Sequence, residues 1–322
     1  MNQTQKKVKL KDFKKIKDTL FTIEHTHINN EQNINKDIFS KNWVSVDKFE
    51  QMEKIEKWQF KWYLSLYGFK SEIRFKEFLQ DKDVILDAGC GLGYKAAWFA
   101  RLNPNATVIG MDISESVIIA AEKYKDLSNL IFIQGDLAKT GLEDSCIDYL
   151  SCDQVLHHTE NPNNTLKEFS RITKTEKEMA LYVYKKKGIP RELLDEYFIS
   201  GERTLSYTER EELSEQLTRL GKTLSDLKCK INVPDIPALN IKGGEYDLQR
   251  FIYWNFLKCY WNEEQGFDIS KSTNVDWYTP AIAFRYNKKE FLNMTQKNKL
   301  ETIFFHEEEA AYSGRFKNVK IS

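Results

Sequence analysis

The chain has 322 residues, and its 48 lysines and arginines balance 48 aspartates and glutamates, so the formal net charge is zero. Hydrophobic residues make up 41% and charged residues 30%, a composition that suits a globular protein with one large core or two smaller ones. A dedicated duplex-binding protein carries a basic excess, which is absent here. No apolar run approaches the roughly 18 residues that a membrane span needs, and no apolar segment of a secretory signal follows the basic N-terminus.

The five cysteines are scattered, without a C-x-x-C pair or a zinc-finger spacing. Such an odd, dispersed set is typical of reduced thiols, so we expect a cytoplasmic protein without a structural metal. His25 and His27 form an H-x-H pattern, but no other ligand-type residues cluster beside them, and we predict no metal site there. The lysines of the polar residues 1–36 could contact RNA or an acidic surface; we interpret this segment as a solvated, partly helical arm.

A helical pattern precedes the first clear strand. Apolar side chains recur at three- and four-residue steps from Phe49 to Leu66, Lys and Glu fill the opposite face, and Gly68 ends the pattern. A second helix is expected over about 71–80. We therefore assign residues 1–69 to an N-terminal arm and helical cap.

Strands and helices then alternate along the middle of the chain. Short apolar runs predict five strands, and helical periodicity predicts helices between them. The predicted strands are 83–88, 106–111, 130–134, 148–152 and 179–184, and the predicted helices are 95–102, 114–125 and about 163–172. Single helices between strands impose right-handed crossovers and a parallel sheet. We therefore expect a doubly wound α/β core over residues 70–186.

The alternation stops beyond Lys187, and we predict a helical insertion over residues 187–275. Thr208 and Glu211 have the spacing of a capping box that opens a helix. Five leucines then recur in 4-3-4-3 steps, at positions 213, 217, 220, 224 and 227. Two interpretations stay open: either residues 208–227 or another part of the insertion forms a homodimer seam, or the helix packs on its own domain.

The last segment, residues 276–322, is predicted to complete the core sheet. Residues 300–306 and 315–321 have strand character, and a turn is expected between them at Ser313 and Gly314. Together with the five earlier strands, these two give a mostly parallel, seven-stranded sheet.

A glycine-rich turn directly follows the first core strand. Asp87 precedes Gly89, Cys90, Gly91 and Gly93 in a D-x-G-C-G-x-G pattern. Glycines there let the backbone approach a ligand that any Cβ would obstruct, and the next helix directs its N-terminus at that ligand. The pattern differs from the G-x-G-x-x-G of nicotinamide-binding proteins, and the Gly-Lys-Ser/Thr of the Walker motif is absent. The turn therefore favours a nucleoside ligand without a pyrophosphate.

Acidic residues also end the next two strands. Asp112 ends the second strand, where a carboxylate can accept hydrogen bonds from both hydroxyls of a ribose. Asp136 follows the third strand, where it can accept from an adenine amine beside the apolar Ile113 and Leu137. The carboxyl ends of successive parallel strands meet at one crevice, so we expect these residues to share one ligand site.

The segment after the fourth strand carries Asp153, His157 and His158 in the pattern D-Q-V-L-H-H. It adds a fourth strand end to the same crevice. A histidine there can remove a proton from a hydroxyl near neutral pH, or it can pack and hydrogen-bond the loop that enters the next helix. Both interpretations stay open for each histidine.

These motifs resemble those of class I S-adenosylmethionine-dependent methyltransferases, which carry V-L-D-x-G-C-G-x-G and V-L-H-H-T patterns. The resemblance is close over residues 83–184. It implies a Rossmann-like fold, S-adenosylmethionine as methyl donor and S-adenosylhomocysteine as product. It also implies that a helical segment, residues 38–67 here, covers the donor, and it slightly favours His157 over His158 as the base. The usual Pro-Gly-Gly turn before the fifth strand is replaced by residues 174–177, at the back of the fold.

The resemblance extends loosely to uncharacterised bacterial members linked to surface-glycan or metabolite modification. No D/N/S-P-P-Y/F/W motif of base-amine methyltransferases follows the fourth strand, and no proline precedes a cysteine as in cytosine C5 enzymes. We therefore disfavour nucleic acid and predict a small-molecule or glycan-precursor hydroxyl as acceptor, with a side-chain base and no metal. An RNA- or protein-directed methyltransferase and a donor-binding protein without turnover are the alternatives. Five aromatic residues are expected to divide between core and acceptor pocket: Trp254, Tyr260, Trp261, Trp277 and Tyr278.

Overall fold

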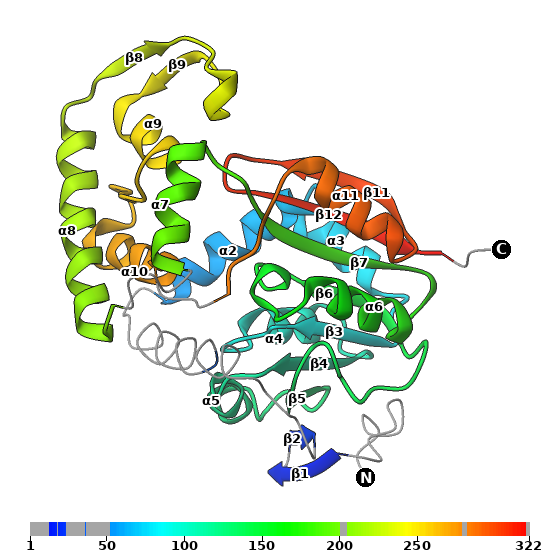
Figure 1. Cartoon of the computed structure of the whole chain (residues 1–322). Helices are drawn as coiled ribbons and strands as arrows, with labels where there is room; N and C mark the ends of the chain where they lie inside the picture. The colour runs from blue at the N-terminus through cyan, green and yellow to red at the C-terminus, as the bar shows by residue number, and fades with distance from the viewer. Residues whose placement is uncertain are drawn as a thin grey trace. The chain divides into compact units, whose positions relative to one another are not determined.

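The computed structural model describes residues 13–17, 19–23, 36, 52–199, 205–278 and 282–319 (Figure 1). The chain divides into two compact units. Unit 1 comprises residues 1–185 and 284–322, and unit 2 comprises residues 186–283. Residues 276–283, expected to belong with the C-terminal strands, are therefore part of unit 2.

Unit 1 is built around a ten-stranded sheet with the order β1-β2-β5-β4-β3-β6-β7-β12-β11, and β10 pairs with β7. Neighbouring strands from β5 to β7 run parallel, whereas β12 is antiparallel to both β7 and β11. The seven strands from β5 to β11 form the mostly parallel, doubly wound sheet that the sequence predicts, and the α/β fold is confirmed. The strands are β1 (Phe13–Lys17), β2 (Leu20–Ile23), β3 (Val84–Ala88), β4 (Thr107–Asp112), β5 (Leu130–Gln134), β6 (Ile147–Cys152), β7 (Thr173–Lys185), β10 (Arg285–Tyr286), β11 (Leu300–Glu307) and β12 (Ala311–Asn318).

The described part of the N-terminal segment is not the solvated, partly helical arm that its lysines predict. Strands β1 and β2 form an antiparallel pair, and β2 runs parallel to β5 at the edge of the sheet. Leu20 and Phe21 are both buried, one in each of the two apolar clusters of the sheet, while Lys14 and Lys15 stay exposed. Burial of two adjacent apolar side chains, together with the pairing of the β5 edge, explains why a lysine-rich segment becomes strand. The H-x-H histidines and residues 38–51 lie outside the described residues.

Two apolar clusters fill unit 1, and alternate residues of each buried strand belong to different clusters. In β3, Ile85 belongs to one cluster, whereas Val84 and Leu86 belong to the other. This alternation is the two-residue period of a strand buried on both faces, as in sheets with helices on each side. The helices of unit 1 are α2 (Met52–Leu66), α3 (Glu72–Leu79), α4 (Tyr94–Leu102), α5 (Ser116–Lys123), the short 3-10 helix η2 (Leu156–His158), α6 (Pro162–Ile172) and α11 (Lys288–Lys297).

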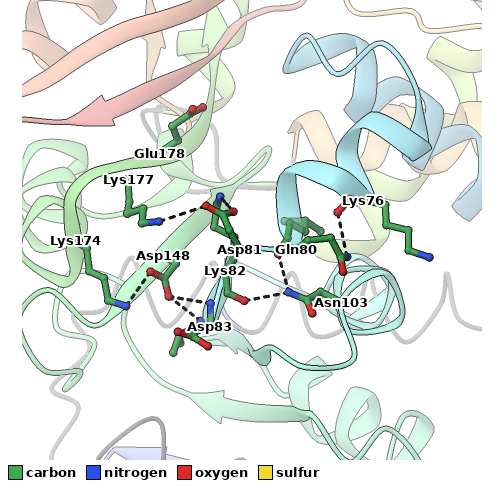
Figure 2. A network of polar contacts seen from close by, with 12 residues as sticks. Lys76, Gln80, Asp81, Lys82, Asp83, Asn103, Asp148, Lys174, Lys177 and Glu178 are labelled. Carbon is green, nitrogen blue, oxygen red and sulfur yellow. Dashed lines mark hydrogen bonds and ion pairs between the residues drawn. The ribbon is translucent and has the colours of Figure 1, made fainter.

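A polar network ties together the amino ends of the central strands, opposite the carboxyl ends where the motifs lie (Figure 2). The Asp148 carboxylate accepts hydrogen bonds from the backbone amides of Asp83 at 3.1 Å and Val84 at 3.0 Å, and from Lys174 Nζ at 2.8 Å. The expected turn at residues 174–177 is absent, because these residues already belong to β7. The pairing of β7 with β6 shifts register in this segment, and Glu176 there has a positive φ of 63°.

The prediction of a turn at Ser313 and Gly314 is wrong, because both residues lie inside β12. The chain reverses instead between Glu307 and Ala311, where β11 ends and β12 begins. Gly314 is required for another reason: a Cβ there would lie 2.4 Å from the carbonyl oxygen of Phe304 on β11. Glycine in a strand thus marked a close approach of two backbones, which sequence alone does not distinguish from a turn.

Unit 2 contains four helices and a small antiparallel sheet among its described residues. The capping box of α8 uses Ser206 and Glu209, two residues before the predicted positions. Gly221 on α8 lies against the backbone of Cys259, and Asn274 of α10 donates a hydrogen bond to Thr218 Oγ1 at 2.8 Å. The elements are α7 (Ile189–Ile199), α8 (Tyr207–Asp226), β8 (Lys230–Val233), the 3-10 helix η3 (Pro237–Leu239), β9 (Gly244–Asp247), α9 (Leu248–Asn255) and α10 (Gly266–Tyr278).

Only some of the regularly spaced leucines of α8 are buried. Leu217 is buried, whereas Leu220 is 39% and Leu227 60% exposed. The buried face is offset from the stripe and includes Ser214 and Thr218. The homodimer seam therefore stays a prediction. None of the helices in the described ranges has the length and apolarity of a membrane-spanning segment.

Candidate functional site

The glycine-rich turn between β3 and α4 adopts a backbone that other residues rarely reach. Gly89, Gly91 and Gly93 have φ values of 80°, 51° and 75°. A Cβ on Gly89 would lie 2.3 Å from a methyl group of Val155, and one on Gly93 would lie 2.7 Å from the ring of Phe132. These contacts and the left-handed conformation explain the requirement for glycine. The turn thus presents bare backbone at the carboxyl end of β3.

Asp112 at the end of β4 is hydrogen-bonded to this turn. Its Oδ2 accepts from the Gly91 amide at 2.8 Å, and its Oδ1 accepts from the amide and hydroxyl of Ser114 at 2.8 and 2.7 Å. The side chain is only half-buried, so its carboxylate is accessible beside the turn. The Cys90 amide donates to Met111 O at 3.0 Å. The Cys90 side chain is buried, and burial raises the pKa of its thiol well above the usual value.

The third expected position lies after β5. Asp136 is buried, and its Oδ1 accepts from the amide of Ala138 at 2.9 Å. Leu137 is buried in the core, whereas Ile113 is half-buried. The strand register places Asp112 opposite Gln134, so the ends of β4 and β5 are adjacent. A hollow of about 680 Å³ adjoins this end of the sheet and is lined by Asp136, Ala138, Lys139, Glu160, Asn161, Asn164, Lys167, Glu168 and Arg171.

Asp153, after β6, belongs to a buried polar network that sequence reasoning missed. Its Oδ2 forms an ion pair with Lys95 Nζ, from the first turn of α4. Its Oδ1 accepts a hydrogen bond from the hydroxyl of Tyr67, the residue directly after α2, at 2.6 Å. Burial is the largest single effect and lowers the pKa of Lys95, but the attractions of Asp153, Tyr94 and Asp87 together outweigh it and raise the pKa. Nothing in the sequence around Lys95 separates it from the surface lysines that alternate with apolar residues elsewhere.

Asp87 is the buried acid of the glycine motif. It lies in β3, and its Oδ2 has no hydrogen-bond partner among the described residues. Burial is the main cause that raises the pKa of Asp87 to about 7, while Lys95 opposes the shift and Asp153 and Asp112 add to it. This carboxyl group therefore changes protonation near neutral pH in the donor-free protein.

We expect Asp87→Asn to stabilise the donor-free protein at pH 8 but not at pH 4. In the unfolded chain an aspartate ionises near its ordinary pKa, whereas folded Asp87 keeps its proton until about pH 7. The wild type thus loses stability as the pH rises from 4 to 7, by up to about 4 kcal/mol for such a pKa difference. Urea unfolding of both proteins across this range measures the effect, with Asp126→Asn on the surface as the control. A stability difference that is constant with pH would contradict the prediction.

The histidine pair lies in η2, directly after the fourth strand end. His157 is fully buried, and its ring centroid is 3.8 Å from the Tyr184 ring and 4.2 Å from the His158 ring. Its carbonyl oxygen accepts from the Phe284 amide at 2.9 Å. His158 is half-buried, so part of its ring is accessible. No group of three or more His, Cys, Asp and Glu side chains suited to a metal ion occurs in the described part of the chain.

The aromatic residues singled out in the insertion and beyond differ in exposure. Trp254 and Tyr260 are half-buried, whereas Trp261, Trp277 and Tyr278 are buried. Because two of the five stay accessible, a pocket role for some of them remains a prediction.

The strand ends therefore bring together the residues that the sequence singled out. Asp87, the glycine-rich turn, Asp112, Asp136 and Asp153 lie at the carboxyl ends of four adjacent parallel strands. Residues 79–220 match the model of the family described as a methyltransferase domain. This part of the chain, less than half of its length, is therefore similar to a methyltransferase domain, in agreement with the prediction from its motifs.

Among curated proteins, similarity is confined to part of the chain. An uncharacterized methyltransferase from Schizosaccharomyces pombe is 31% identical over 107 residues, which is 30% of this chain and 38% of that protein. A demethylmenaquinone methyltransferase from Staphylococcus carnosus is 32% identical over 91 residues, 28% of this chain and 38% of the relative. A malonyl-[acyl-carrier protein] O-methyltransferase from Legionella pneumophila is 28% identical over 89 residues, 27% of this chain and 31% of the relative. The matches thus span less than two fifths of each of these relatives.

Proposed function

We propose that this protein transfers a methyl group from S-adenosylmethionine to a hydroxyl of a small molecule or sugar. The observation that carries the proposal is the set of polar groups at four successive strand ends, with bare glycine backbone at the first. A sheet of this kind binds its ligand at the carboxyl ends of its strands. The match to the methyltransferase domain supports the donor, and the relative named as an O-methyltransferase supports an oxygen atom as the methylated position.

The residues at the strand ends suit the parts of the donor. Asp112 has an accessible carboxylate that can accept from ribose hydroxyls while it holds the Gly91 amide. Asp136, with Ile113 and Leu137, offers an acceptor beside apolar surface for the adenine. When bound, the sulfonium of the donor supplies an activated methyl group. The chain itself must align the acceptor, exclude water and remove the hydroxyl proton.

We expect Asp112→Ala to weaken binding of S-adenosylhomocysteine at least tenfold. The substitution removes hydrogen bonds to a charged acceptor, worth roughly 1.5–3 kcal/mol each. It also releases the Gly91 amide, which loosens the turn. Calorimetric titration of the product into wild type and variant measures the change, with the exposed Asp126→Ala as the control. Equal affinities for wild type and Asp112→Ala would remove Asp112 from the donor site.

We assign acceptor selection to unit 2, since the strand ends of unit 1 are used for the donor. His158 is our candidate for the base because part of its ring is accessible, whereas His157 is fully buried. The resemblance to methyltransferases slightly favours His157, and we prefer His158 because His157 is fully buried. A base must come within hydrogen-bond distance of the proton that it removes.

The proposal is tested by incubating the purified full chain with S-adenosylmethionine and a panel of hydroxylated metabolites, sugar nucleotides, RNA and peptides. Formation of S-adenosylhomocysteine together with a methylated metabolite or sugar supports it. Methylation of RNA or peptide alone favours the alternative enzyme class. Donor binding without transfer to any acceptor favours a binding protein without turnover.

The contribution of the basic N-terminus needs a variant that preserves the sheet. Removal of residues 1–36 would also remove β1 and β2 and expose the edge of β5. Deletion of residues 1–12, combined with Lys14→Gln and Lys15→Gln, removes positive charge and leaves both strands in place. An enzyme for small molecules keeps its activity in this variant, whereas an RNA-directed enzyme loses it.

A further inference from the structure

Unit 2 contains a buried lysine that forms no ion pair with any described residue. Lys258, between α9 and α10, is 5% exposed. Its Nζ lies 4.4 Å from the centroid of the Trp277 ring and 5.8 Å from that of Tyr253. Among the described residues, these ring faces are its only close partners, and no hydrogen bond or ion pair satisfies its donors. A buried ammonium group ordinarily requires a carboxylate or several acceptors.

A second buried cation faces the same tryptophan. Arg191 of α7 is fully buried, and its Cζ lies 4.9 Å from the Trp277 ring centroid. Its Nε donates to both carboxylate oxygens of Asp195 at 2.9 Å, and its Nη1 donates to the Tyr253 carbonyl. Its Nη2 makes no hydrogen bond to a described residue, so donors of this guanidinium also remain available.

The charges of this cluster do not balance. Two buried cations, Arg191 and Lys258, face one buried carboxylate, Asp195, and the nearby Asp276 is exposed to solvent. Burial, and then repulsion by Arg191, lower the pKa of Lys258 to about 7, against the weaker opposing effects of Asp195 and Asp276. An anion bound beside both cations would replace the water that these groups lose on burial, and it would balance the excess positive charge.

We propose that Lys258 Nζ and Arg191 Nη2 form a binding site for the carboxylate or phosphate group of a small-molecule ligand. The cluster lies entirely within unit 2. The binding of the anion itself requires no methyl donor.

The test measures anion binding by the full chain in the absence of donor. The probes are benzoate, for a carboxylate, and phenyl phosphate, for a phosphate monoester. In protein labelled with 13C at lysine Cε, the Lys258 resonance is identified by its loss in Lys258→Met. We expect one of the two probes to raise the apparent pKa of Lys258, because the anion binds the charged amine more tightly than the neutral one. The preferred probe distinguishes a carboxylate ligand from a phosphorylated one.

The same probe should raise the melting temperature of the wild type and of Lys242→Met, an exposed lysine variant of the same unit, but not that of Lys258→Met. We expect Lys258→Met to weaken binding at least about tenfold, as loss of a charge-assisted hydrogen bond does. It should fold with at least wild-type stability at pH 7, because it removes a buried charge without a partner.

Two outcomes overturn the proposal: neither probe changes the Lys258 titration, or Lys258→Met binds the probe as well as the wild type. Anion binding without methyl transfer to any acceptor would refute the proposed function alone. Methyl transfer to an uncharged acceptor, with no anion binding, would refute the anion site alone.

Discussion

His158→Ala is expected to lower methyl transfer to a responsive acceptor at least about hundredfold, the contribution of a positioned general base. Affinity for S-adenosylhomocysteine should stay within about threefold, because the donor is held by other strand ends. We expect the effect on transfer because η2 follows the fourth strand end, and the ring of His158 is partly accessible there. Single-turnover transfer with saturating donor separates this effect on the chemical step from an effect on binding.

The neighbouring histidine provides the matched comparison. His157→Ala removes a fully buried ring that packs on Tyr184 and His158, so it should lower stability while the transfer step of the folded fraction changes less. If the transfer rates of both variants stay near that of the wild type, the pair is structural. The base would then have to be sought at Asp153 or at a tyrosine of unit 2.

Lys95→Met is expected to lower the free energy of unfolding by about 3–5 kcal/mol, the usual loss when one partner of a buried ion pair is removed. Lys95 and Asp153 are both buried, with side chains 9% and 2% exposed. Methionine keeps most of the volume. Among the described residues it leaves the Asp153 carboxylate with the Tyr67 hydroxyl and a longer contact from Gln154 at 3.2 Å. Urea unfolding at pH 7 without donor measures the change.

Two further variants identify the cause. Adding Asp153→Asn to Lys95→Met should recover part of the lost stability, because the remaining group is then uncharged. Lys123→Met breaks the partly exposed pair with Glu56, whose atoms lie 3.8 Å apart, and should cost less than about 1 kcal/mol. A loss of that small size for Lys95→Met would show that the buried pair contributes little.

Much of the donor site was predictable from the sequence because its determinants are local. The glycines follow a short apolar strand directly, and their positive φ values are properties of that turn. Asp112, Asp136 and Asp153 each occur where an apolar run ends, and parallel strands bring such ends to one edge of the sheet. The alternation of apolar runs and helical patterns therefore determined both the fold class and the residues at its carboxyl edge.

Other features depended on partners distant in the chain, and only the tertiary structure decided them. Lys95 and Asp153, which form an ion pair, lie 58 positions apart in the chain. Position 314 requires glycine because the backbone of Phe304 on β11 lies too close for a Cβ. The lysine-rich β1 is a strand because it pairs with the apolar β2, which in turn pairs with the edge of β5. Lys258 and Arg191, 67 positions apart in the chain, both lie close to the ring of Trp277 only in the folded structure. Local patterns report backbone preference and which face is apolar, whereas burial and charge pairing depend on which distant segments meet.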